Sequence, residues 1–133
     1  MIVLDENIAR FVVSEAIEQW YPGQVVSINE LRPASTIKDE AIPMLLRRAK
    51  EATFVTTNVS DYWLKVQISF VYCVVAIEIP NERISEIPRL LREILQLETF
   101  KTKAARMGKV IHWTPTRIEY YEENRRIIAL PQE

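Results

Sequence analysis

The chain has 133 residues, of which 48% are hydrophobic and 26% are charged, and its formal net charge is −1 at pH 7. This length and composition are typical of a single globular domain, expected to span residues 1–133. So small a net charge gives the chain no overall attraction to nucleic acid or to an anionic membrane. Its one cysteine excludes an internal disulfide and a cysteine-based zinc site, and its two glycines exclude a glycine-rich phosphate loop.

The first part of the chain predicts two short strands separated by a helix. Residues 2–4 are an apolar strand, and a helix is expected over about 8–20, ended by Pro22-Gly23. Helical spacing predicts that the buried face of this helix consists of Ile8, Phe11, Val12, Ala16 and Trp20. Residues 25–28 predict the second strand, and a loop is expected over 29–35.

A second helix is expected in the next segment, with apolar residues at Ile42, Leu45, Leu46 and Ala49. Proline is tolerated only in the first turn of a helix, so Pro43 places the helix start close to Asp39. Residues 53–57 predict a third strand, with a turn at 58–61. Residues 69–79 are apolar enough to form a strand in the centre of the sheet.

The last part of the chain predicts a long helix and an antiparallel end. Ser85 is expected to cap a helix running to about residue 98, with Pro88 in its first turn. Residues 101–107 extend or follow that helix, and Gly108 ends the segment. Strands are expected at 110–113, 117–121 and 125–130, with the last two forming a hairpin.

Strands that alternate with helices predict an α/β fold with three layers, α/β/α. The central sheet is expected to be mostly parallel, with right-handed crossovers and a short C-terminal β-hairpin.

Three aspartates occupy positions where such a fold gathers ligands. Asp5 follows the first strand, Asp39 precedes a helix, and Asp61 follows the third strand. Ligands of α/β proteins bind outside the carboxyl ends of the strands, and magnesium prefers oxygen ligands such as carboxylates. Each residue also has a structural interpretation, since aspartate favours helix caps (Asp5, Asp39) and turns (Asp61).

The segments around these aspartates resemble the PIN-domain superfamily, and more closely its compact PIN-like branch. They are Leu4-Asp5-Glu6-Asn7, Lys38-Asp39-Glu40-Ala41-Ile42 and Val55-Thr56-Thr57-Asn58-Val59-Ser60-Asp61-Tyr62. The resemblance implies a ribonuclease that depends on Mg²⁺ or Mn²⁺, often the toxin of a toxin–antitoxin pair. It also implies that Asp5, Asp39 and Asp61 are the catalytic, metal-binding carboxylates and that Asn58 lines the same pocket. Glu6 and Glu40 adjoin the aspartates and are additional candidates.

The resemblance also implies partners, namely an RNA substrate and an antitoxin protein. A second copy of the chain is expected from the aromatic residues and from the habit of the family. Two basic groups are candidates for gripping a phosphate backbone near the pocket, although most such charges simply face solvent. These groups are Arg47, Arg48 and Lys50, and Lys101, Lys103, Arg106 and Lys109.

An alternative hypothesis is a catalytically silent PIN-like module for protein interaction or oligomerisation. It is favoured by the lack of a clear fourth acid in the first half and by Trp113, Tyr120 and Tyr121 near the C-terminus. A phosphoacceptor receiver domain fits poorly, because residues 57–60 separate Asp61 from the strand end. The apolar stretches are too short to span a bilayer and the N-terminus does not resemble a signal peptide, so a cytoplasmic location is expected.

Overall fold

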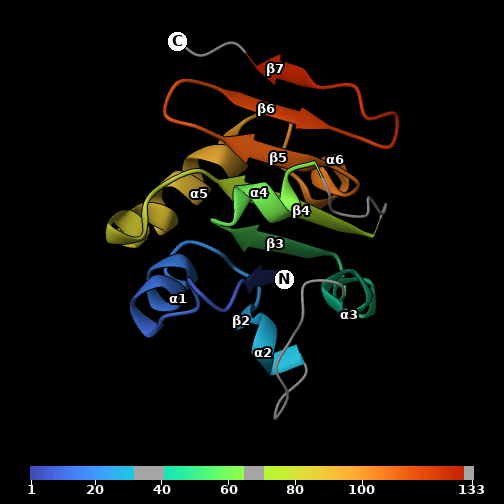
Figure 1. Cartoon of the computed structure of the whole chain (residues 1–133). Coiled ribbons are helices and arrows are strands. Elements are labelled where there is room, and N and C mark those ends of the chain that lie inside the picture. Colours follow the sequence, from blue (N-terminus) through green and yellow to red (C-terminus); the bar gives the residue numbers. More distant parts are fainter. Residues whose placement is uncertain (32–40, 65–70, 131–133) are drawn as a thin grey trace.

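The computed structural model describes residues 1–31, 41–64 and 71–130 of the chain (Figure 1). Its strands are β1 (Ile2–Leu4), β2 (Val25–Ser27), β3 (Ala52–Thr56), β4 (Tyr72–Ile77), β5 (Val110–Trp113), β6 (Ile118–Tyr121) and β7 (Ile128–Leu130). Its helices are α1 (Phe11–Glu18), α2 (Ile28–Leu31), α3 (Ile42–Arg48), α4 (Val59–Tyr62), the 3₁₀ helix η2 (Asn81–Glu86), α5 (Ile87–Gln96) and α6 (Lys103–Arg106).

The strands of the described residues form one sheet in the order β2-β1-β3-β4-β5-β6-β7. All pairs from β2 to β5 are parallel, whereas β5–β6 and β6–β7 are antiparallel. The predicted mostly parallel sheet with a C-terminal hairpin is therefore confirmed. The predicted central strand is also confirmed, because β4 is buried at every position and lies between β3 and β5.

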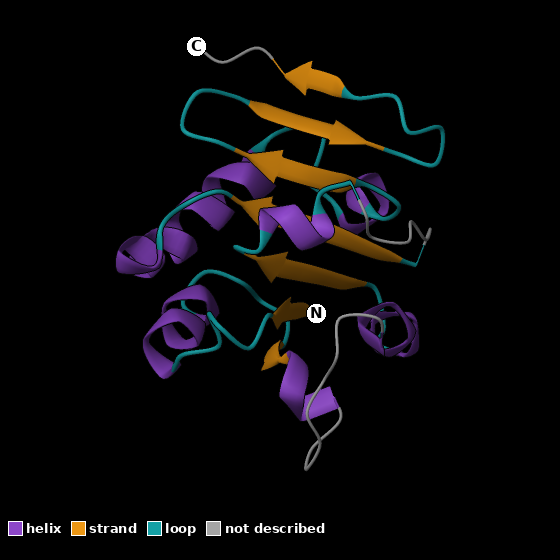
Figure 2. Ribbon diagram, in the orientation of Figure 1, coloured by secondary structure: helices purple, strands orange, loops and turns teal. Residues whose placement is uncertain are grey.

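Helices cover both faces of the sheet, as expected for a three-layer α/β/α fold (Figure 2). The two-residue period of β4 sends Cys73 and Val75 into one core and Tyr72 and Val74 into the other. The first core is completed by buried residues of α1 and α5, and the second by those of α2, α3 and α4. None of the helices within the described ranges is long and apolar enough to cross a membrane.

The two prolines that were expected to mark helix starts do so. Pro43 lies in the first turn of α3, which begins at Ile42, and Pro88 lies in the first turn of α5. The predicted start of α3 near Asp39 falls outside the described residues. The buried side of α5 carries the apolar residues Ile87, Leu90, Leu91, Ile94 and Leu95.

The predicted buried face of the first helix is wrong at Phe11 and Val12, although Ile8 is buried as expected. Phe11 and Val12 are 77% and 71% exposed, and the buried residues of the helix are Val13 and Ile17. The apolar residues Val12, Val13, Ala16 and Ile17 form one broad stripe, so their spacing alone does not fix which part of it faces the sheet. The chain is extended at Arg10, and the helix starts only at Phe11, which brings Val13 and Ile17 onto the sheet.

Local details differ at three further places. The predicted turn at 58–61 is largely the short helix α4, and the start of the predicted loop at 29–35 belongs to α2. The N-cap position of α5 is Glu86 rather than Ser85, because η2 runs directly into the helix. The segment after α5 forms a separate helix, α6, and the chain turns at Gly108 with a φ of 86°.

Candidate functional site

The carboxyl ends of the central strands place a row of side chains on one face of the sheet. Thr56 of β3 pairs with Ala76 of β4, Ala76 pairs with His112 of β5, and His112 pairs with Glu119 of β6. Asp5 extends the row beyond β3, since it follows β1 and is bonded to Thr56. Side chains alternate along a strand, so this row faces the same core as Val74 and lies beneath α4.

Asp5 is held by two hydrogen bonds at the edge of the core. The backbone N–H of Glu6 donates to Oδ1 at 2.8 Å, and the hydroxyl of Thr56 donates to Oδ2 at 2.7 Å. Asp5 is only 8% exposed, so both bonds lie in an environment from which most water is excluded. Hydrogen bonds of this kind fix the direction of a carboxylate that binds a metal.

The hydrogen bonds continue from Asp5 to Asp61. Oγ1 of Thr56 accepts from the backbone N–H of Asn58 at 3.0 Å, and Nδ2 of Asn58 donates to Oδ2 of Asp61 at 2.7 Å. We refer to the four residues Asp5, Thr56, Asn58 and Asp61 as the Asp5–Asp61 chain. It links two of the three predicted aspartates, which come from distant parts of the sequence, through the predicted pocket residue Asn58.

The structure shows whether Asp5 caps a helix and whether Asp61 lies in a turn. Asp5 does not cap α1: that helix begins after Arg10, and the N–H of Ile8 is bonded to the backbone oxygen of Asp5. Asp61 lies in the first turn of α4, where its exposed side chain accepts the bond from Asn58. Asp5 therefore does not cap α1, and Asp61 lies in a short helix rather than in a turn.

Two of the candidates lie outside the described residues, namely Asp39 and Glu40. Glu6 is described, and it contributes its backbone N–H to Asp5 while its side chain is exposed. Across the described ranges, no three histidine, cysteine or acidic side chains are grouped closely enough to hold a metal ion.

A surface pocket of about 350 Å³ lies beside the Asp5–Asp61 chain. It is lined by Thr57, Asn58, Val59, Ser60, Glu78, Ile79 and Pro80. Glu78 is a candidate that the sequence analysis missed, and it directly follows β4. The argument used for Asp5 and Asp61, an acid just beyond an apolar strand, applies equally to Glu78 and could have found it.

Glu78 also belongs to a second polar group, which is centred on His112. His112 lies between two glutamates, with Nε2 at 3.3 Å from Oε1 of Glu78 and Nδ1 at 3.1 Å from Oε1 of Glu119. His112 is 7% exposed, and its ring lies 4.8 Å from that of Trp63. His112 therefore connects the carboxylate of Glu78 in the pocket wall to the buried carboxylate of Glu119.

The single thiol is not a candidate nucleophile. Cys73 is fully buried in β4, and burial raises the pKa of its thiol to about 12. The thiol is therefore neutral at physiological pH, and only the thiolate is an effective nucleophile.

The two basic groups do not lie near the Asp5–Asp61 chain. Arg47 and Arg48 end α3 just before β3 begins, and residues 101–109 immediately precede β5. Strands β3 and β5 belong to the parallel part of the sheet, so both groups lie at its amino edge, opposite the carboxyl edge. The expectation that they grip a phosphate backbone near the pocket is therefore wrong.

Comparisons with protein-family models, with curated proteins and with solved structures found no match to this chain. The resemblance to the PIN-like branch thus remains a prediction from three sequence motifs.

Proposed function

We propose that this chain is a metal-dependent endoribonuclease of the PIN-like type, which hydrolyses RNA phosphodiester bonds with Mg²⁺ or Mn²⁺. The observation that supports it most is the Asp5–Asp61 chain. It unites two motif aspartates and Asn58 at the carboxyl ends of β1 and β3, where α/β proteins bind their ligands.

The donor set fits a hard cation. Asp5 and Asp61 offer carboxylate oxygens, Asn58 offers an amide oxygen, and the predicted third carboxylate is Asp39. When bound, such a cation lowers the pKa of a water and neutralises charge on the phosphate that is attacked. Thr56 and the N–H of Glu6 hold Asp5 in place before any ligand arrives, which reduces the cost of organising the site.

Residues of the neighbouring pocket have roles in this proposal. Ser60 and Asn58 present a hydroxyl and an amide to the space in which the RNA backbone would lie. Glu78 is the carboxylate of the pocket wall, and we assign to it the acceptance of a proton from the attacking water. His112, bonded to Glu78, holds that carboxylate in position. Toxin activity and an antitoxin partner belong to the same proposal.

The test is cleavage of a labelled single-stranded RNA in the presence of Mn²⁺. We expect cleavage by the wild-type chain, 5′-phosphate ends on the products, and loss of activity with EDTA. Asp5→Asn and Asp61→Asn should each reduce the rate at least 100-fold with an unchanged fold by circular dichroism. Glu123→Gln, at an exposed position in the turn before β7, is the control and should cleave normally. Equal cleavage by the wild type and Asp5→Asn would contradict the proposal.

A second candidate function is a catalytically silent interaction or oligomerisation module. The observation that favours it is the exposure of Phe11 and Val12, neighbouring apolar side chains at the start of α1. The C-terminal aromatic residues give it less support than expected, because Tyr121 is fully buried. Calorimetric titration with Mn²⁺ separates the two functions: the nuclease binds the ion through Asp5, and the silent module does not.

A further inference from the structure

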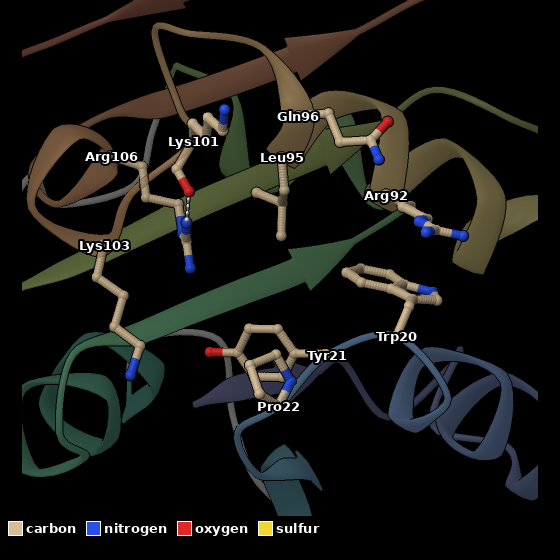
Figure 3. A pocket seen from close by; sticks show the side chains of 9 residues that line it. All are labelled: Trp20, Tyr21, Pro22, Arg92, Leu95, Gln96, Lys101, Lys103 and Arg106. Atoms are coloured by element: carbon tan, nitrogen blue, oxygen red, sulfur yellow. Dashed lines mark hydrogen bonds between the residues drawn. The ribbon is translucent and has the colours of Figure 1, made fainter.

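We propose that the chain has a second ligand site, for a nucleoside monophosphate, at the amino edge of the sheet. The site is a cavity of about 370 Å³ shown in Figure 3. It is lined by Trp20, Tyr21, Pro22, Arg92, Leu95, Gln96, Lys101, Lys103 and Arg106. We refer to it as the basic cavity. Its volume lies in the range of small-molecule sites, about 300–1,000 Å³.

The basic cavity is far from the Asp5–Asp61 chain in the fold. Nε of Arg106 donates to the hydroxyl of Thr53 at 2.9 Å, and Thr53 lies at the start of β3. The amino group of Met1, just before β1, donates to the hydroxyl of Tyr21 at 3.1 Å. These contacts place the cavity at the amino ends of two strands whose carboxyl ends carry Asp5 and Thr56. The inference therefore does not rest on the proposed nuclease function.

Arg106 is the central observation. Its side chain is 3% exposed and is locked by bonds from Nε to Thr53 and from Nη1 to the backbone oxygen of Phe100 at 3.1 Å. Neither bond uses Nη2. No buried side-chain nitrogen of the described residues lacks a hydrogen-bond partner, so Nη2 is not a buried orphan, and Arg106 lines the cavity. Figure 3 shows the guanidinium projecting into the space between the lining side chains, so a fixed donor already faces any ligand there.

The other charges of the basic cavity have the same sign. Arg92, Lys101 and Lys103 add three cations, and none of the lining residues is acidic. Lys103 and Lys101 each approach a glutamate outside the lining, at 3.9 Å, but these long contacts between exposed groups are weak. Burial lowers the pKa of the Met1 amino group, and Lys103 and Arg106 lower it further, as expected near a concentration of positive charge.

The shape of the basic cavity suggests which anion it takes. In Figure 3, Lys103 and Arg106 lie at one end, whereas the indole ring of Trp20 and the side chain of Arg92 lie at the other. A phosphate fits the first end, since guanidinium and ammonium groups bind it through charge-assisted hydrogen bonds. A planar base fits the second end, where it would stack on Trp20. The hydroxyl of Tyr21 accepts from Met1, which leaves its own hydrogen to donate toward the ligand.

The test is calorimetric titration of the full chain, without divalent cations, with three probes: adenosine 5′-monophosphate, adenosine and inorganic phosphate. We expect the nucleotide to bind more tightly than either fragment. Lys103→Gln and Arg92→Gln should each weaken its binding at least fivefold. Arg89→Gln is the matched control on the same helix, because Arg89 faces Glu86 and Glu93 instead of the cavity. Its affinity should stay within twofold of the wild type. These exposed side chains are used because a change at buried Arg106 could unfold the chain.

Four results would overturn the proposal: no binding of the nucleotide at 5 mM, adenosine or phosphate binding as tightly as the nucleotide, equal affinity in Lys103→Gln and the wild type, or equal weakening in Arg89→Gln. Asp5→Asn should bind the nucleotide normally. This expectation keeps a failure of the basic cavity distinct from a failure of the nuclease proposal.

Discussion

The hydroxyl of Thr56 joins the two halves of the Asp5–Asp61 chain, so its removal tests whether that chain organises the site. Thr56→Val keeps a β-branched side chain in buried strand β3 but removes Oγ1. The carboxylate of Asp5 then loses a donor at 2.7 Å, and the N–H of Asn58 loses its acceptor at 3.0 Å. The substitution replaces the buried hydroxyl with a methyl group of similar size.

The expected magnitude follows from these two bonds. A hydrogen bond to a charged group contributes about 1.5–3 kcal/mol, and a neutral one contributes about 0.5–1.5 kcal/mol. The added methyl group returns about 0.8 kcal/mol by burial. The free energy of unfolding should therefore fall by about 1–4 kcal/mol. In a domain of this size, that corresponds to a decrease in melting temperature of about 4–16 °C.

The assay is urea denaturation followed by circular dichroism, with two controls. The first control, Thr56→Ser, keeps the hydroxyl group. The second, Thr57→Val, removes the hydroxyl of the partly exposed Thr57, which accepts one hydrogen bond from Asn7. Thr57→Val should change the free energy of unfolding by less than about 1 kcal/mol. A double-mutant cycle of Thr56→Val with Asp5→Asn should give a coupling of at least about 1 kcal/mol. Equal stability of Thr56→Val and Thr57→Val, or a coupling below about 0.3 kcal/mol, would refute the reasoning.

Three further predictions concern the fold. Since burial raises the pKa of Cys73 to about 12, iodoacetamide should label this thiol at pH 8 only after denaturation. The folded pKa is higher than the ordinary thiol pKa of 9.0, so stability should fall as pH rises above 9.0; a labelled native thiol would contradict the expected burial. Gly108→Ala should lower the free energy of unfolding by about 1–2 kcal/mol in urea, because φ is 86° there; an unchanged midpoint would argue against it. Phe11→Ser should change the free energy of unfolding by less than about 0.5 kcal/mol, whereas Ile17→Ala should lower it by about 2–5 kcal/mol. A larger loss for Phe11→Ser than for Ile17→Ala would show that α1 is buried on its other face.

The strands were predictable because each is a short apolar run bounded by residues that break a strand. Pro80 follows the end of the longest run, and β4 ends shortly before it. Pro43 and Pro88 were similarly informative, because proline fits a helix only in its first turn. The link between Asp5 and Asp61 could be anticipated, since both follow strands that a parallel sheet brings to the same edge.

The rest depended on packing that single-sequence patterns do not contain. The side of α1 that faces the sheet is chosen by contacts of Val13 and Ile17 with residues distant in sequence, whereas the local pattern allowed Phe11 equally well. The position of the basic groups was deducible in principle, because residues that precede a parallel strand lie at its amino end. Arg106 could not be recognised as buried, because its partner Thr53 is distant in sequence.

The most direct test of the central claim is a crystal structure of the chain grown with Mn²⁺ and measured at a wavelength where manganese scatters anomalously. The account predicts one anomalous peak within about 2.5 Å of carboxylate oxygens of both Asp5 and Asp61, with Asp39 as a further ligand. A peak at another position, or a map without a peak between Asp5 and Asp61, would contradict it.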